Sequence, residues 1–309
     1  MFIEMKLKKV IQVLIFCLVI PNMIFSQYQK VNSNGLDIYY RIFGKGEPIL
    51  IIGGGPGDVS DRYLSLCELL SQKYQCVLVE QRGTGKSSPE ISDSTTISIS
   101  LTLSDFEEIR KKIAFDKWTI LGFSYGGYLS SLYAHFYPGS ISSLVLLNSM
   151  GLGTDAFEYF SDNIDSKLQE SDRIVIEYWS DSARYSQNPH HAITEMIRAK
   201  MPGYFYDRKK SLIVSQTMKD SDFNFEVGQW IWKDIYERKL DLSGFNSDFS
   251  KPVLIIHGRQ DPLGESVPQS LHNYYKQSKL RIIEKCGHYS WIEQPENVLN
   301  AIADFLSEH

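Results

Sequence analysis

One pentapeptide limits what this chain can fold into: Gly122-Phe123-Ser124-Tyr125-Gly126, which has the pattern Gly-x-Ser-x-Gly. Before it, Trp118 to Leu121 is a short apolar run with β-branched residues, which predicts a buried strand. After it, apolar residues recur at helical spacing from Tyr128 to Tyr137 and stop at Pro138-Gly139. A serine on so sharp a turn between a strand and a helix is exposed at the carboxyl end of a sheet. We therefore predict that Ser124 is a nucleophile.

The rest of the chain alternates short apolar runs with helical patterns. The runs that predict further strands are Pro48–Ile52, Cys76–Glu80, Ile141–Leu147, Pro252–Ile256 and Leu280–Ile283. Such alternation predicts an α/β protein with a mostly parallel central sheet and helices on both faces. A hairpin is expected around Asn34-Gly35. A helix is expected over Thr102–Ile113, with Ser104 as its N-cap and Glu107 completing a capping box.

Residues 152–248 interrupt this alternation, because they are rich in aromatic and charged residues and contain helical patterns without a clear buried strand. We predict that they form a helical cap inserted after the sixth core strand. The core would then consist of residues 27–151 and 249–309. A length of 309 residues does not require a second independent domain, since α/β folds of this size often form one.

The N-terminal residues 1–26 differ in composition from the rest. Three lysines precede the apolar run Val10 to Ile20, and a small residue, Ser26, follows. This pattern predicts a signal peptide cleaved after Ser26 and export to a periplasmic or secreted location. The run is short for a membrane span, so no stable span is expected after cleavage, although a retained N-terminal anchor is the alternative.

The charge and the cysteine and histidine residues indicate which partners, disulfides and metal sites to expect. The net charge is −5 and no basic run interrupts the body of the chain, so we expect no nucleic-acid partner. Beyond residue 26 the cysteines are Cys67, Cys76 and Cys286, too few for a disulfide framework, with pairing of the first two left open. The adjacent pair His190-His191 does not share a helix face, so no metal site or cofactor is predicted.

A nucleophilic serine needs a base that takes its proton, and the base needs a carboxylate that orients it. In a parallel sheet these partners should follow later strands. His288 comes after the run Leu280–Ile283, and Asp261 comes after Pro252–Ile256. We predict His288 as the base and Asp261 as the acid, with Asp155 as an alternative acid.

An oxyanion formed at the substrate carbonyl needs two backbone N–H donors. One is expected from Tyr125, directly after the nucleophile, and the other from Gly55 in the glycine run after Pro48–Ile52. Glycines let the backbone approach a substrate closely, so Gly54 is also predicted to contact it. The spacing in this run does not match the dinucleotide-binding pattern Gly-x-Gly-x-x-Gly.

Five segments occur together in this order: Gly53–Gly57, Gln81–Ser87, Gly122–Gly127, His257–Asp261 and Gly287-His288. As a set they resemble the proline iminopeptidase branch of the α/β-hydrolases, serine aminopeptidases that release N-terminal proline. The resemblance covers about residues 36–150 and 250–307. It implies the α/β-hydrolase fold, an acyl-enzyme mechanism and a short-peptide or other small-molecule substrate. Gly53 departs from the usual histidine of this branch, and Glu80 from the usual aspartate.

The resemblance also implies a cap glutamate that binds the free amine of the substrate, a few residues before a Tyr-Phe pair. Tyr204 and Phe205 resemble that pair and are expected to bind substrate, but Met201 takes the place of the glutamate. Glu177, Glu195 and Glu226 are the alternatives, and the aromatic residues beside Glu226 favour it. The predicted function is an exported serine aminopeptidase; the alternatives are a carboxylesterase or lactonase, and a non-catalytic binding protein.

Overall fold

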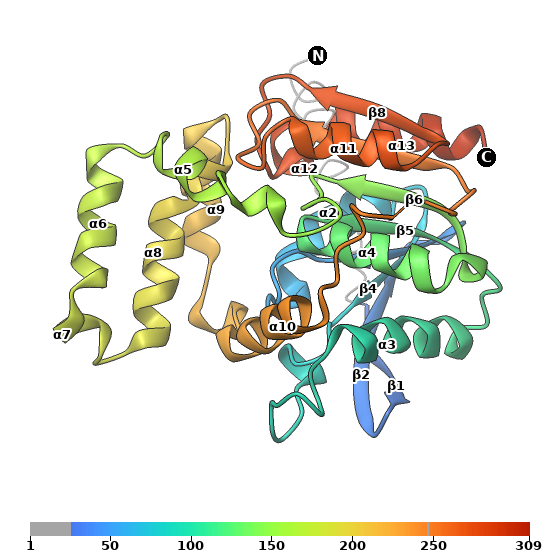
Figure 1. Ribbon diagram of the computed structural model, residues 1–309, viewed down its shortest axis with the longest axis horizontal. Coiled ribbons are helices and arrows are strands. Elements are labelled where there is room, and N and C mark those ends of the chain that lie inside the picture. Colours follow the sequence, from blue (N-terminus) through green and yellow to red (C-terminus); the bar gives the residue numbers. More distant parts are fainter. Residues whose placement is uncertain (1–25, 246) are drawn as a thin grey trace, which may run out of the picture.

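The computed structural model describes residues 26–245 and 247–309. All but the last residue of the expected signal peptide therefore lies outside the described residues. An eight-stranded sheet of order β1-β2-β4-β3-β5-β6-β7-β8 runs through the centre (Figure 1). The strands are β1 (Gln29–Ser33), β2 (Leu36–Phe43), β3 (Pro48–Ile52), β4 (Gln75–Val79), β5 (Trp118–Phe123), β6 (Ile141–Leu147), β7 (Val253–Gly258) and β8 (Ser278–Ile283).

The sheet is mostly parallel, as expected. Pairing is antiparallel only where β2 meets β1 and β4, and the strands from β4 to β8 pair in parallel. Asn34 and Gly35 have φ angles of 49° and 81°, which confirms the hairpin turn between β1 and β2. Strands β5 and β7 are buried along their whole length, since both faces of the sheet are covered.

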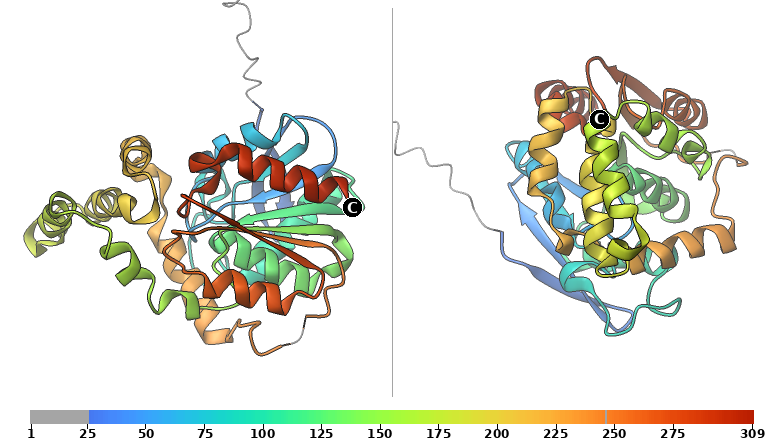
Figure 2. Two further views of the ribbon diagram at one scale, coloured as in Figure 1. Left: turned by 90° about the horizontal axis from the view of Figure 1, so that it is seen from above. Right: turned by 90° about the vertical axis from the view of Figure 1, so that its left-hand side faces the viewer.

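Helices cover both faces of the sheet (Figure 2, left). One face is covered by α2 (Leu64–Leu70) and α13 (Pro295–Ser307). The other is covered by α3 (Ile99–Lys112), α4 (Tyr125–Phe136) and α11 (Ser266–Tyr274). Two shorter elements, the 3-10 helix η1 (Ser60–Tyr63) and α12 (Ser290–Glu293), lie next to α2 and α13 in the chain.

The predicted start of α3 was wrong. Ser104 lies inside the helix, which begins at Ile99, and the side chain of Ser98 accepts a hydrogen bond from the Leu101 N–H at 3.3 Å. An N-cap needs extended backbone, which Ser98 has and a residue within the helix does not. Glu107, expected to complete the cap, instead pairs with Arg110 at 2.7 Å.

Helices fill the segment between β6 and β7. They are α5 (Phe160–Asp165), α6 (Glu170–Ser180), α7 (Ser182–Tyr185), α8 (Pro189–Tyr204), α9 (Arg208–Thr217) and α10 (Phe225–Arg238), with the 3-10 helices η4 (Asp155–Phe157) and η5 (Asp220–Asp222). Figure 1 shows α6, α7 and α8 projecting away from the sheet, whereas α10 lies beside α3. The inner face of α10 joins the main core through Val227, Ile231 and Ile235, so this helix anchors the insertion to the sheet layer.

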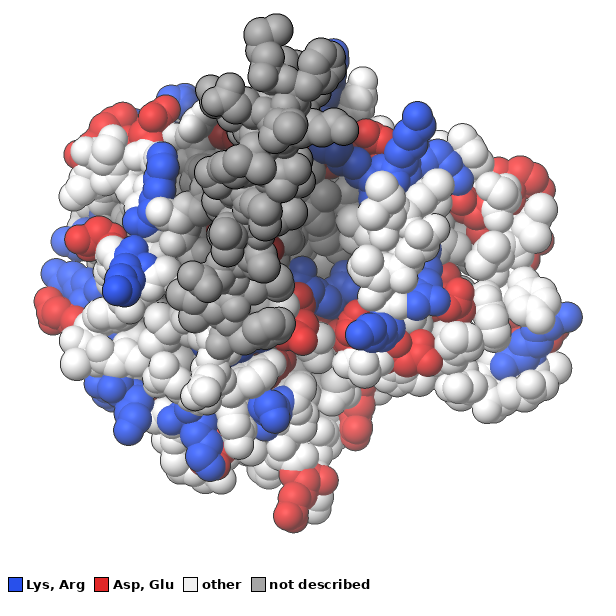
Figure 3. Space-filling model, turned by 180° about the vertical axis from the view of Figure 1, so that it is seen from behind, with Lys and Arg blue, Asp and Glu red and all other residues white. Residues whose placement is uncertain are grey.

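The surface carries both signs of charge. On the face drawn in Figure 3, basic and acidic side chains are interspersed. Within residues 26–245 and 247–309, no helix is both long and apolar enough to cross a membrane. Cys67, Cys76 and Cys286 are buried and free.

Candidate active site

Ser124 lies on the turn between β5 and α4, in a strained backbone conformation with φ 54° and ψ −119°. A positive φ is costly for a residue with a Cβ, so the surroundings must enforce it. The Ser124 N–H donates to the Leu147 carbonyl at 3.1 Å, and its carbonyl accepts from the Met150 N–H at 2.9 Å. A Cβ on Gly126 would come within 2.2 Å of the Ile52 carbonyl oxygen, so only glycine fits there. The neighbouring strands therefore hold the serine on its sharp turn.

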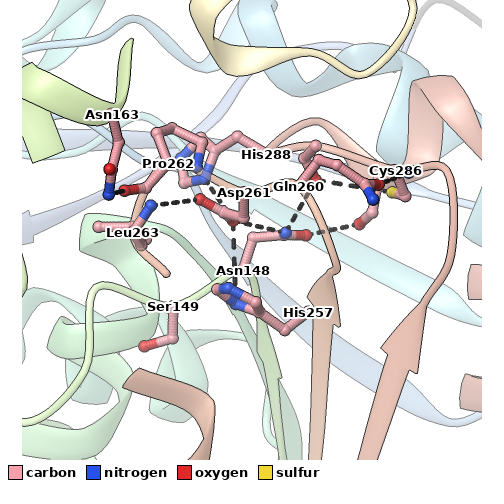
Figure 4. Close-up of polar contacts among 12 residues, drawn as sticks. Asn148, Ser149, Asn163, His257, Gln260, Asp261, Pro262, Leu263, Cys286 and His288 are labelled. Carbon is pink, nitrogen blue, oxygen red and sulfur yellow. Dashed lines mark hydrogen bonds and ion pairs between the residues drawn. The ribbon is translucent and has the colours of Figure 1, made fainter. Parts of the chain in front are cut away.

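Asp261 and His288 form a hydrogen-bonded pair, as the order of strands predicted. Asp261 follows β7 and His288 follows β8, and His288 Nδ1 lies 2.8 Å from Asp261 Oδ2 (Figure 4). Both side chains are buried, and the His288 ring lies 4.8 Å from the ring of Phe123, the residue before the nucleophile. No hydrogen bond joins Ser124 to His288 among the described residues; catalytic contacts of this kind often tighten only with substrate. The alternative acid, Asp155, is exposed in η4.

The surroundings of Asp261 keep it charged. Burial alone raises its pKa, but the charges of His288 and His257 and the hydrogen bonds from His288 and the Leu263 N–H lower it more, so the pKa lies well below its ordinary value. His257 Nδ1 lies 3.8 Å from Asp261 Oδ2, and burial lowers the pKa of this histidine. An ionised Asp261 can hold the Nδ1–H tautomer of His288 and stabilise its cationic form.

Two backbone N–H groups beside the nucleophile fit an oxyanion hole. A Cβ on Gly54 would come within 3.1 Å of Ser124 Cβ, so the glycine run lies directly against the nucleophile. Gly55 has a φ of 43°, and its N–H and that of Tyr125 make no hydrogen bond within the described part of the chain. A developing oxyanion requires free backbone N–H donors of this kind.

Comparison with known proteins agrees with this geometry. Residues 47–295 match the family described as the alpha/beta hydrolase fold. The chain belongs to the α/β-hydrolase fold family. A relative from Bacillus subtilis strain 168, the AB hydrolase superfamily protein YclE, is 27% identical over 272 residues, which cover 86% of this chain and 93% of the relative.

A proline iminopeptidase of Saccharolobus solfataricus is 23% identical to this hydrolase over 290 residues, covering 89% of this chain and 90% of that protein. Among solved structures, an esterase from Exiguobacterium antarcticum has a TM-score of 0.66 at 19% identity, with 91% of this chain and all of that one covered. The structural likeness supports the fold alone, whereas the family match and the relatives support an enzyme of the hydrolase type.

The two departures from the proline iminopeptidase pattern have local structural reasons in this hydrolase. A Cβ on Gly53 would come within 2.2 Å of the Tyr63 ring, so a histidine there would displace the ring. Glu80 is buried and accepts hydrogen bonds at 2.7 Å from Ser60 Oγ and from Thr84 Oγ1. Neither position contributes a group to the predicted triad.

Asn148 was missed by the sequence analysis. It follows β6, is fully buried, and donates from Nδ2 to Asp261 Oδ2 at 2.7 Å and to the Gly287 carbonyl at 3.2 Å (Figure 4). Its Oδ1 accepts from Ser290 Oγ at 2.6 Å. Asn148 therefore links the loops of the acid and the base. The signal was a polar residue directly after an apolar strand, which is close to the rule that identified Asp261 in the loop after β7.

Glu293 was missed as well. Its buried carboxylate accepts hydrogen bonds from the N–H groups of Gly287 at 2.6 Å, Asp207 at 2.7 Å and Tyr206 at 3.0 Å. Gly287 precedes the predicted base, whereas Tyr206 and Asp207 belong to the cap. One carboxylate thus holds the His288 loop and the cap together.

The cap also binds the loop of the acid. Asn163 Nδ2, on α5, donates to the Pro262 carbonyl at 2.9 Å (Figure 4). Lys167 Nζ donates to the carbonyls of Gln260 and Gly203. Asp261 lies between Gln260 and Pro262, so cap side chains fix the backbone on both sides of it.

Tyr204 and Phe205, the expected substrate-binding pair, have different surroundings. The Tyr204 ring lies 5.7 Å from the His288 ring. The backbone carbonyl of Tyr204 accepts a hydrogen bond from the His288 N–H at 2.7 Å. Phe205 is buried and stacks on Tyr289 at 5.0 Å. The Tyr204 ring therefore lies beside the predicted base, whereas the Phe205 ring is buried against Tyr289. Met201 is buried in the same cluster as Phe205.

The three glutamates that could bind the substrate amine lie in different surroundings. Glu226 is exposed in the first turn of α10, and the neighbouring Gly228 lies against Pro56, since a Cβ on it would come within 3.0 Å of the Pro56 carbonyl oxygen. Glu177 is exposed on the projecting helix α6 (Figure 1), and Glu195 pairs with Arg198. Of the three, Glu226 is the one whose helix contacts the glycine run.

Aromatic rings surround the predicted base. The rings of Phe160 and Tyr289 lie 6.4 and 5.8 Å from the His288 ring, in addition to those of Phe123 and Tyr204. Such a shell limits the access of water to the reacting groups. His190 and His191 lie elsewhere, and both contact Asp220. Within residues 26–245 and 247–309, no group of three or more His, Cys, Asp or Glu side chains is placed to hold a metal ion.

Proposed function

We propose that this hydrolase is a serine aminopeptidase that acts on short peptides with a free N-terminus. The observation that carries the proposal is the hydrogen bond between Asp261 and His288, at the same sheet edge as the strained Ser124. The relatives named proline iminopeptidase support the peptide substrate.

In the proposed reaction, Ser124 Oγ attacks the substrate carbonyl while His288 Nε2 takes the hydroxyl proton. Asp261 stabilises the imidazolium, and the N–H groups of Gly55 and Tyr125 bind the oxyanion. Collapse of the tetrahedral intermediate breaks the C–N bond, with the proton passing from His288 to the departing amine. Water, deprotonated by His288, then attacks the acyl-enzyme and releases the acid together with free Ser124.

The N-terminal amine of the substrate needs an acidic partner, because burying an unpaired cation is costly. Glu226 supports this role, since α10 begins against the glycine run that contains the predicted oxyanion donor Gly55. Tyr204 would cover the ring of the substrate's first residue.

A second candidate function is a carboxylesterase or lactonase with the same triad. The observation that favours it is the aromatic shell of His288 together with the burial of Met201 where the resemblance implies a glutamate. A neutral acyl ester would need no acidic partner in the cap.

A substrate panel tests these proposals. Purified protein would be assayed on prolyl and alanyl arylamides, each with a free and a blocked amine, and on short acyl esters. The aminopeptidase function predicts that blocking the amine lowers kcat/KM at least tenfold, as does Glu226→Gln, whereas the matched control Glu177→Gln leaves it unchanged. Equal cleavage of free and blocked arylamides, with faster cleavage of esters, would favour the second candidate.

A further inference from the structure

A cavity of about 550 Å³ lies between core and cap, next to the candidate site. Its walls come from η1 and α2 of the core, from α9 and the turn that follows it in the cap, and from Tyr289 and Ile292. The triad side chains do not line it. Tyr289 lines this cavity and also lies beside the candidate active site, because its ring is 5.8 Å from the His288 ring and 5.5 Å from the Phe123 ring.

The positively charged guanidinium of Arg62 lies at the wall of this cavity. Its side chain is 11% exposed, with Nε 3.0 Å from Asp58 Oδ2 and Nη2 donating to Tyr289 Oη at 3.2 Å. The guanidinium lies over the Phe223 ring at 4.6 Å. Nη1 makes no hydrogen bond with any described residue, although Arg62 lines the cavity. The guanidinium is therefore held in place with donor capacity left for a ligand.

The other charged lining residues are less suited to orient a ligand. Asp61 is 60% exposed and pairs with Arg41 at 2.6 Å. Asp222 accepts from the backbone N–H of Lys219 at 2.9 Å. Glu68 and Lys219 are exposed. Between these charges the walls are apolar, through Leu64, Val214, Met218 and Ile292 among others.

Arg62 is also connected to the glycine run. Its partner Asp58 is so near Gly55 that a Cβ on Gly55 would come within 2.7 Å of Asp58 Oδ1. The Arg62–Asp58 pair thus lies between the predicted oxyanion donor and the cavity.

We propose that this cavity is the subsite for the part of the substrate beyond the scissile bond, and that Arg62 binds a free carboxylate there. The inference rests on the proposed aminopeptidase function and names its substrate class: di- and tripeptides with a free C-terminus. The planar guanidinium is suited to a carboxylate, and the apolar walls would hold the side chain of the terminal residue.

The test compares prolylglycine with prolylglycinamide, which differ only in the terminal charge. A hydrogen-bonded carboxylate predicts that kcat/KM is roughly 10- to 100-fold higher for the free acid. Because Arg62→Met alone would leave Asp58 unpaired, the variant to use is the double change Asp58→Asn and Arg62→Met. It should remove the preference for the acid while cleavage of the amide changes by less than about threefold. Arg184→Met, on the exposed α7, is the matched control and should keep the preference.

Equal kcat/KM for acid and amide in the unchanged protein would overturn the inference, as would a double variant that keeps the preference or loses both substrates equally. If neither dipeptide is cleaved, the proposed function has failed, and calorimetry with Ser124→Ala decides separately about the subsite. Tighter binding of prolylglycine than of its amide, abolished when Arg62 is replaced, would support it. No binding of either, or equal binding, would refute it.

Discussion

At the scale of single residues, the most specific prediction concerns Ser124, the predicted nucleophile. Replacing its hydroxyl by Ser124→Ala removes the nucleophile but keeps a Cβ in the same strained backbone. We expect kcat to fall by several orders of magnitude, on the order of 10⁶ as for a well-studied serine hydrolase, with an unchanged far-ultraviolet circular dichroism spectrum. A folded variant with a tenth of the original activity on the best substrate would contradict the assignment.

Asp261 is expected to act through His288. Asp261→Asn keeps the size of the side chain but loses the charge and favours the wrong imidazole tautomer, so kcat should fall roughly 10⁴-fold by analogy with the serine proteases. The control is Asp155→Asn, since Asp155 is exposed and follows a different strand. If Asp155→Asn lowered kcat strongly and Asp261→Asn had little effect on it, the acid would have been assigned to the wrong loop.

His257 gives a prediction about pH and stability. Burial lowers its pKa in the folded protein, although Asp261 opposes this in part. Below the ordinary histidine pKa of about 6.5, the unfolded chain therefore binds a proton that the folded chain does not. The free energy of unfolding should fall as pH drops through this range.

Chemical denaturation at pH values between about 5 and 8 measures this fall. The variant His257→Gln should show a shallower dependence on pH than the unchanged protein. An identical slope in His257→Gln would show that other groups control the dependence. Asp261 contributes at lower pH, because its pKa is depressed and its stabilisation is lost only as it becomes protonated.

At the scale of elements, Glu293 at the end of α12 couples the cap to the base loop. Glu293→Gln retains one acceptor oxygen and turns an NH₂ group toward backbone N–H donors. Since a hydrogen bond to a charged group contributes about 1.5–3 kcal/mol, we expect the free energy of unfolding to fall by about 2 kcal/mol or more. Because Gly287 loses its partner, kcat should fall more than KM rises.

The matched control for this change is Glu296→Gln, on the exposed side of α13 in the next turn of the chain. Steady-state kinetics and thermal unfolding of both variants give the comparison. Glu293→Asp, which keeps the charge, should recover part of the activity. If Glu293→Gln lowered stability but left kcat unchanged, the residue would support the fold without positioning His288.

The attachment of the cap follows from several such contacts. Asn163 and Lys167 bind the acid loop, while Glu293 and the Tyr204 carbonyl bind the base loop. The helices between β6 and β7 therefore do more than cover the site, because they fix the backbone that presents Asp261 and His288.

At the scale of the whole molecule, the sequence predicts export. Lysines before the apolar run Val10–Ile20, and the small residue Ser26 after it, predict Gln27 as the first residue of the mature protein. N-terminal sequencing of protein from the exported fraction would check this. Protein that retains Met1 and stays in the cytoplasm would contradict it, and retained Met1 at the membrane would favour the anchor.

The strands of the sheet, and the positions of Ser124, Asp261 and His288 in loops at the ends of strands, could be predicted from the sequence alone. Each of these depends on local patterns: apolar runs of strand length, a glycine turn around Ser124, and polar residues in the loops that follow strands. Parallel strands bring their carboxyl ends to one edge, so Asp261 and His288 could be assigned without knowledge of the cap.

The contacts that support these residues exist only in the folded protein. Asn148 bonds to Asp261 across 113 positions of sequence, and Arg62 to Tyr289 across 227. Glu293 binds backbone N–H groups, which every residue except proline carries, so its partners leave no mark in the sequence. Such contacts depend on how loops and cap helices pack against the sheet, and no local periodicity encodes that packing. For the same reason the sequence did not reveal that Phe205, which is expected to bind substrate, is buried against Tyr289.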